Sequence, residues 1–244
     1  MHELWFTTFL NNYLAAPANA ILNAAGQPAV NPAKPWTNYM AMEIFVIAIL
    51  LIVPLLVRSS ISATKPGTLQ QFFEVILEFI KGQAEDIIGH GSKKYVYMFT
   101  TFFIFILTAN LLGIIPTFES PTMYVGVPLG LALISFFYYN GAGIKEQGII
   151  GHLKHFAGPV LLLAPAMFLI EIISHMARPV SLTIRLFANM LAGEEVTLKF
   201  LEMVPIGVPV IFMGMHVFVA LLQAFIFTVL SMIYVGGAVA HEDH

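Results

Sequence analysis

The stretch NYMAMEIFVIAILLIVPLLV, residues 38–57, is an apolar run that ends at Arg58 and two serines. A helix of about 20 such residues spans the hydrocarbon core of a lipid bilayer. The single acidic residue, Glu43, falls near the start of the run, where its carboxylate can reach the polar interface. The stretch therefore predicts a transmembrane helix.

The composition of the whole chain agrees with several such helices. Of its 244 residues, 58% are hydrophobic and 10% are charged, whereas about 25% are charged in an ordinary soluble domain. The net charge of −3 does not favour binding to the negatively charged backbone of nucleic acid. The lack of cysteine excludes disulfides and thiolate metal sites. We expect an all-α polytopic membrane protein that needs no cofactor or metal.

Apolar runs and the turns between them predict the organisation of the chain. We expect an external N-terminal segment, 1–35, and a single membrane domain, 36–244, with spans at about 38–57, 95–116 and 123–143. Residues 67–88 place apolar and charged side chains on opposite faces of a helix, which is typical of an interfacial amphipathic helix. A polar loop, 141–158, precedes two final apolar stretches.

These last stretches, about 159–200 and 206–240, are each far longer than one span. They predict a long, strongly tilted C-terminal helical hairpin. Basic residues in the loops then predict the orientation, because such residues stay on the cytoplasmic side. With the N-terminus outside and the C-terminus cytoplasmic, only Lys34 and Lys199 lie outside; the inner side holds Arg58, Lys65, Lys81, Lys93, Lys94, Lys145 and Lys154.

Polar side chains within the final stretches mark the candidate site, because each is costly in a bilayer. His216 and Gln223 are seven residues apart and share one face of the last helix. On the preceding helix the spacing keeps a second polar set close to one side: Glu171, Ser174, Arg178, Arg185 and Asn189. The sequence thus predicts two facing polar stripes with one cation near the middle.

Purely structural roles are the alternatives for several of these residues. Glu171 and Arg178 can form a structural ion pair, and His216 can be a core histidine bonded to a neighbour. Ser174 can bond to its own helix backbone. Arg185 fits such a role poorly, because its guanidinium stays charged when buried and no carboxylate of its helix lies one turn away. Its counter-ion can therefore belong to another chain.

Two blocks of sequence together resemble a known family. They are PVSLTIRLFANMLAGEE, 179–195, and MHVFVALLQAFIFTVLSMIYVGGA, 215–238. Both are closely similar to subunit a of the F-type ATP synthase membrane sector, and NLLGIIPTFESPT, 110–122, is similar to the end of that family's third helix. The resemblance covers nearly all of the chain from about residue 36.

The resemblance implies a stator subunit that couples proton translocation to rotation and ATP synthesis. Arg185 matches the arginine that faces the carboxylates of the subunit c ring, between two offset proton half-channels. Gln223 matches a position near that arginine. The matches to the half-channels are Asn189, Glu194 and His216 on the outer side, and Glu171 and Ser174 on the inner side. Glu195 stands beside Glu194, which leaves open which of the two carboxylates lines the channel.

The implied partners are the subunit c ring, the subunit b peripheral stalk, the F1 catalytic sector and the lipid bilayer. The implied location is a bacterial inner membrane. ATP chemistry belongs to the soluble partners, and the chain carries neither an H-E-x-x-H nor a G-x-S-x-G motif of its own. The alternative, a stand-alone secondary transporter or ion channel, predicts paired broken helices or an internal repeat, which the sequence does not show.

Overall fold

The structure is a computed structural model that describes residues 3–24, 26, 28–59, 61–62, 65–89, 91–115, 118–157, 164–203 and 207–239. The described part contains α-helices and two short 3₁₀ turns, η1 (Ser92–Lys94) and η2 (Pro121–Met123), and no strand. The prediction of an all-α polytopic membrane protein is confirmed. Four of the described helices are long and apolar enough to span a bilayer, namely α2, α5, α6 and α7.

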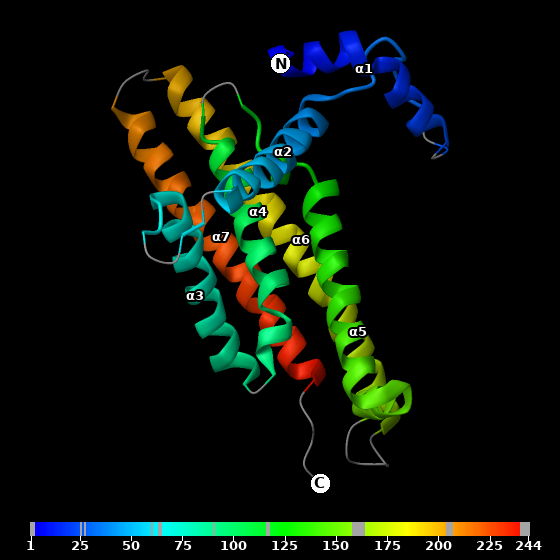
Figure 1. The fold of residues 1–244 in the computed structure, drawn as a ribbon. Coiled ribbons are helices and arrows are strands. Elements are labelled where there is room, and N and C mark those ends of the chain that lie inside the picture. Colours follow the sequence, from blue (N-terminus) through cyan, green and yellow to red (C-terminus); the bar gives the residue numbers. More distant parts are fainter. Residues whose placement is uncertain are drawn as a thin grey trace.

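The N-terminal segment is more ordered than the sequence led us to expect. Helix α1 (Trp5–Ala24) occupies most of it, with a break at Leu14, and lies across one end of the molecule (Figure 1). Asn11 looks like a helix breaker in the sequence, yet its amide is buried and bridges two segments. It donates to the carbonyl of Trp36 (3.1 Å) and accepts from the Trp36 amide (2.9 Å).

Helix α2 (Asn38–Ser59) covers the run that opens the membrane domain, predicted as 38–57. Its outer surface remains apolar and exposed at Leu51, Leu55 and Leu56. Exposed apolar surface of this kind is expected where a helix faces lipid.

Helix α3 (Thr68–Ile88) has three distinct faces. Ile76, Ile80 and Ala84 are buried against α4 (Val96–Leu112) and α7 (Val208–Val239). A second face exposes the apolar side chains of Leu69, Phe72, Val75 and Phe79, and a third carries Glu74, Glu78, Lys81 and Glu85. A helix with protein, apolar and charged faces side by side suits the boundary between lipid and water.

Helix α5 (Gly126–Ala157) extends well beyond the predicted span, 123–143. The predicted polar loop at 141–158 is wrong for residues 141–157, because they are helical on both sides of a kink at Gly148. Only Gly148 leaves helical geometry, with φ 71°, a backbone conformation that glycine adopts without a steric penalty. Charged residues and glycines near the end of an apolar run predict a loop, although these residues are helical here.

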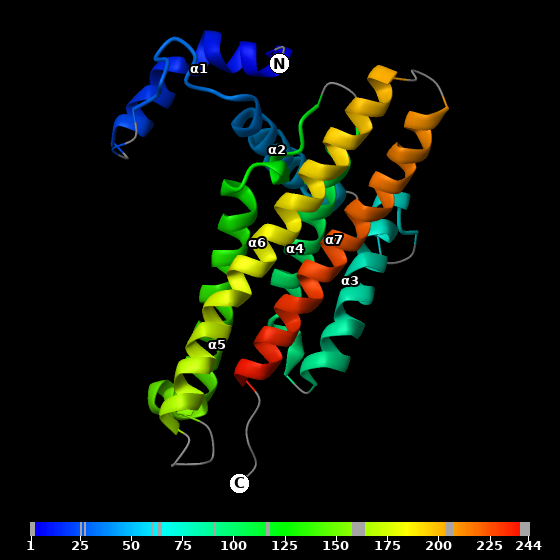
Figure 2. The same cartoon turned by 180° about the vertical axis from the view of Figure 1, so that it is seen from behind.

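Helices α6 (Ala164–Met203) and α7 run side by side as the long C-terminal hairpin (Figure 2). At about 1.5 Å per residue, the 40 residues of α6 span about 60 Å, twice the hydrocarbon thickness. A helix of this length must tilt strongly or run partly along the membrane. Pro179 lies within α6 without ending it, and Thr183 donates to the Pro179 carbonyl at 2.7 Å.

The core lies between α4, α5, α6, α7 and the inner face of α3. One buried hydrogen bond crosses this core, from Ser135 of α5 to Ser231 of α7 at 2.9 Å. The largest fully buried side chains of this core include Ile80, Phe99, Ile106, Tyr139, Leu186, Met190 and Met232.

Candidate functional site

Arg185 lies midway along α6, at the edge between the buried and open faces of that helix. Leu182 and Leu186 on one side are buried, whereas Ile184 and Ala188 on the other are exposed. Within the described part of the chain, the half-buried guanidinium makes no hydrogen bond and no ion pair. A permanent cation is thus held at mid-span beside an open, largely apolar helix face.

Gln223 does not act as a partner of this guanidinium in the structure. Its side chain is buried on α7, and no hydrogen bond joins it to Arg185. Asn189 is exposed on the open side of α6. Neither amide side chain bonds to Arg185 in the described structure.

Glu194 and His216 are brought together in a cavity of about 610 Å³, which we call the outer cavity. The cavity lies between the start of α1, residues 113–115 and 118–119, α6 and α7, and its polar lining consists of Glu3, Glu119, Glu194, Thr197 and His216. One carboxylate oxygen of Glu194 and Nε2 of His216 are buried without a hydrogen-bond partner among the described residues. Buried polar atoms without a protein partner usually bond to ordered water.

The imidazole of His216 packs directly against the backbone of α6. A Cβ added to Gly193 would lie 3.3 Å from both Cε1 and Nε2 of the ring. Glycine at 193 therefore lets the histidine of α7 approach the residue next to Glu194.

The structure separates the two adjacent carboxylates that the sequence could not distinguish. Glu194 is half-buried and lines the outer cavity, whereas Glu195 is exposed and does not. Consecutive residues of an α-helix point about 100° apart, so only one of them can face α7.

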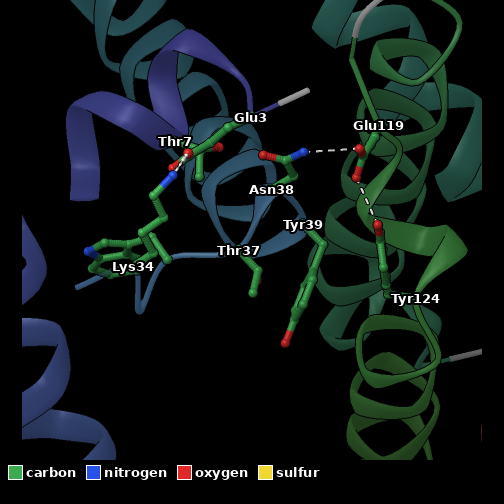
Figure 3. Close-up of a pocket in the computed structure, with 9 residues that line it drawn as sticks. Glu3, Thr7, Lys34, Thr37, Asn38, Tyr39, Glu119 and Tyr124 are labelled. Atoms are coloured by element: carbon green, nitrogen blue, oxygen red, sulfur yellow. Dashed lines mark hydrogen bonds and ion pairs between the residues drawn. The ribbon is translucent and has the colours of Figure 1, made fainter. Parts of the chain in front are cut away.

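A second cavity of about 370 Å³, which we call the vestibule, adjoins the outer cavity and shares Glu3 and Glu119 with it (Figure 3). Asn38 donates to one oxygen of Glu119 at 3.1 Å, and the Tyr124 hydroxyl donates to the other at 2.8 Å. Across the vestibule, Lys34 pairs with Glu3.

The segment that carries Glu119 is held by buried hydrogen bonds. Thr122 donates to Asn110 at 2.6 Å, and Ser120 donates to the carbonyl of Ala109 at 3.0 Å. The Asn110 amide reaches the carbonyl of Ala220 on α7, at 3.5 Å. These bonds tie residues 120–122 to α4, and α4 in turn to α7, and so fix the wall of the outer cavity.

We expect Gly113→Ala to destabilise this wall. A Cβ at position 113 would lie 2.5 Å from Cβ of Ser120 and 3.0 Å from its backbone N, so the segment would have to move. Overpacking of this kind costs about 1–3 kcal/mol. The measurement is the thermal unfolding temperature of the purified chain in detergent.

The matched control is Gly130→Ala, because nothing lies within 4 Å of a Cβ added there in α5. Alanine favours a helix over glycine by about 1 kcal/mol, so this variant should be neutral or more stable. Equal unfolding temperatures for the two variants would show that residues 113 and 120 are not in close contact.

A polar cluster lies toward the other end of α6. Arg178 donates to Glu171 at 3.5 Å, and its guanidinium lies over the rings of Tyr139 and Tyr234, at 5.8 and 5.0 Å from the centroids. The ion pair weighed as an alternative is therefore present. Ser174 is exposed and makes no hydrogen bond in the described structure.

His175 joins this cluster and was not singled out from the sequence. Its Nε2 lies 3.0 Å from Oδ1 of Asn140, and its Nδ1 lies 4.0 Å from Glu171. Its position one helical turn after Glu171 was the available signal.

Glu119, Tyr124 and Glu3 were also missed as site residues. The acidic turn around Glu119 was visible in the sequence, but its neighbours come from distant segments, as in the bond to Asn38. No cluster of three or more histidine and acidic side chains with the geometry of a metal site occurs among the residues that the structure describes. The chemistry that these carboxylates and this imidazole can perform is proton transfer.

Comparisons with known proteins agree with this geometry. The model of the family described as ATP synthase A chain matches residues 40–236. ATP synthase subunit a of Koribacter versatilis (strain Ellin345) is 49% identical over 240 residues, 98% of each chain. The protein of the same name from Solibacter usitatus (strain Ellin6076) is 51% identical over 232 residues, 95% of this chain and 99% of its own.

A third relative, ATP synthase subunit a 3 of Pelobacter propionicus, is 41% identical over 244 residues and the full length of both chains. The shared sequence thus includes α6, α7 and the segment that joins α4 to α5. Because the family match covers most of the chain and the relatives match over nearly all of it, this chain belongs to the ATP synthase A chain family.

Proposed function

We propose that this chain is the stator of a rotary proton path, in which Arg185 faces the carboxylates of a subunit c ring. The observation that carries the proposal is the unpaired guanidinium at mid-span of α6, beside exposed Ile184 and Ala188. A fixed cation in an apolar setting needs an anion nearby. A carboxylate on a helix of another subunit can supply this anion only at the open face of α6.

Two polar regions on either side of Arg185 support two offset half-channels. The outer cavity holds Glu194 and His216 near the end of the bundle that α1 covers (Figure 1). The cluster around Glu171 lies toward the opposite end of α6. In this proposal Asn189 and Gln223 line the outer half-channel, and Ser174 lines the inner one.

The permanent charge of Arg185 separates the half-channels. A ring carboxylate that takes up a proton becomes neutral and can turn through lipid, whereas the ionised form is held at the arginine. A guanidinium does not release its proton at physiological pH, so protons cannot pass directly from one half-channel to the other. The membrane potential contributes about 2.3 kcal/mol per charge for each 100 mV.

The surroundings follow from this role. The chain contacts the subunit c ring at the open face of α6, is held by the subunit b peripheral stalk, and acts with an F1 sector that carries out the ATP chemistry. We place it in a bacterial inner membrane with the N-terminus outside and the C-terminus cytoplasmic. The position of α1 and of the end of α7 at opposite ends of the bundle supports that orientation (Figure 1).

The test is ATP-driven acidification of inverted membrane vesicles that carry Arg185→Ala. Assembly of the variant chain is checked by isolating the complex through a tag on a partner subunit. An assembled complex that hydrolyses ATP without pumping supports the proposal. Normal pumping would make Arg185 a structural residue and would refute it.

A further inference from the structure

Glu119 occupies the wall between the vestibule and the outer cavity. Its side chain lines both cavities. Among the charged residues that the structure describes, Glu3 is the other one that lines both. Figure 3 shows its carboxylate between Asn38 of α2 and Tyr124, which precedes α5. A group in this place can exchange protons with either cavity.

Two hydrogen bonds hold the carboxylate of Glu119 in place between the two cavities. Both of its oxygens accept bonds, from Asn38 and from Tyr124, so the ionised form is held in one orientation. Burial and the bond to Glu119 raise the pKa of the Tyr124 hydroxyl, so this group remains a donor and not a competing base.

The next carboxylate along the path is Glu194. Glu119 and Glu194 both line the outer cavity, close enough for their charges to interact. Two carboxylates that share a cavity favour the state in which one is protonated and the other ionised. That arrangement lets a proton move from one to the other without a change of total charge.

Other charged groups face Glu119 across the vestibule, but they suit a different role. The hydrogen bonds from Lys34 and Asn11 lower the pKa of Glu3, so that carboxylate stays ionised and is a fixed charge. Tyr39 and Lys34 also line the vestibule, and His216 faces Glu119 across the outer cavity. Among the carboxylates here, Glu119 is the one placed to hand protons inward.

Residues 3–5, which lead into α1, form the roof over this route. Glu3, Leu4 and Trp5 line the outer cavity, and the amide of Leu4 donates to Oδ1 of Asn38 at 3.3 Å. Asn38 therefore links Leu4, just before α1, to the carboxylate of Glu119 through its two amide atoms. The family match begins at residue 40, so this roof lies outside it.

We infer that Glu119 carries protons between the vestibule and Glu194, under a roof formed by residues 3–5 and the Glu3–Lys34 pair. In the inward direction a proton from external water neutralises the Glu119 carboxylate, then leaves for the Glu194 carboxylate through water in the outer cavity. One acid ionises as the other is neutralised. The inference rests on the proposed function and adds a residue to its outer path.

Glu119→Gln in the complete complex tests this inference, with ATP-driven pumping measured in inverted vesicles. We expect pumping to fall about tenfold, below the 10²–10⁴ typical of a lost acid–base group, because water in the cavity can still reach Glu194. Glu119→Asp should restore most of the rate. The control is Glu202→Gln, since Glu202 is exposed on α6 and pairs only with Lys199.

The accessibility of position 119 to an ion from the outer aqueous phase is a second measurement. A purely structural role of Glu119 does not require such access. The chain contains no cysteine, so Glu119→Cys introduces a single thiol. In inverted vesicles the outer face of the chain lies inside, so silver ions loaded into the vesicle lumen should reach this thiol and stop the remaining pumping by that variant. Leu55→Cys, on the exposed apolar surface of α2, should not confer sensitivity.

Arg185→Ala measured in the same vesicles separates the two hypotheses. If Arg185→Ala blocks pumping and Glu119→Gln pumps normally, the inference is wrong and the proposed function stands. A thiol at 119 that silver cannot reach also overturns the inference. If Arg185→Ala itself pumps normally, the proposed function fails and the inference fails with it.

Discussion

Arg185→Ala is expected to reduce proton pumping by about 100-fold or more, while the chain stays assembled. Without the guanidinium, an ionised carboxylate of the ring has no counter-charge at mid-membrane. A charge placed there costs about 2.5–3.5 kcal/mol, and each 1.36 kcal/mol added to a barrier slows a step tenfold. Because Arg185 has no partner among the residues that the structure describes, its removal leaves no carboxylate of that part of the chain unpaired.

Arg185→Lys tests whether pumping requires a guanidinium at this position or only a positive charge. An ammonium can lose its proton when it is buried, whereas a guanidinium stays charged and offers several donors in a fixed plane. We therefore expect Arg185→Lys to pump little better than Arg185→Ala. It should also increase passive proton leak, since a deprotonated lysine no longer bars direct transfer between the half-channels.

The measurements are acidification by inverted vesicles and passive proton flux after the soluble sector is stripped off. Lys199→Ala is the control, because Lys199 is an exposed cation of the same helix with a partner of its own, Glu202. Pumping by Arg185→Lys at the unaltered rate would show that charge alone suffices. Loss of pumping by Lys199→Ala would point to a general effect of charge on α6.

The fold was predictable where hydrophobicity alone decides the structure. The run at 38–57 forms α2, and the two over-long apolar stretches form the hairpin of α6 and α7. Prediction was poorer where contacts between distant segments determine the structure. Asn11 reads as a turn residue, but it is buried in α1 because Trp36 supplies its hydrogen bonds from far along the chain. Gly141 likewise does not end α5, since only Gly148 takes a positive φ.

The candidate site was predictable for residues that stand out against an apolar background. Arg185 and His216 are polar residues in long apolar helices, and both were identified by that contrast. Glu119 lies in a polar turn, where a carboxylate is unremarkable until its bond to Asn38, 81 residues away, is known. The choice between Glu194 and Glu195 depends on the direction in which each side chain points from α6. The order of residues in the sequence does not reveal that direction.

Glu194→Gln and His216→Ala should each slow pumping by about 10- to 100-fold, and the double variant should be little worse than the slower single one. Both groups face the outer cavity, where the histidine lies against Gly193. Residues that act in series on one proton are not additive, because losing either interrupts the same transfer. Two independent paths would instead multiply the two losses.

Glu195→Gln is the matched control for this pair, since it removes the same group one residue away, from an exposed position outside the cavity. Rates are measured from about pH 6 to pH 8, where an unperturbed histidine changes charge and a relay that includes one should depend on pH. We expect His216→Ala to flatten that dependence and Glu195→Gln to leave it intact. If Glu195→Gln slowed pumping and Glu194→Gln did not, the outer cavity would not be the proton path, because the carboxylate that matters would then lie outside it.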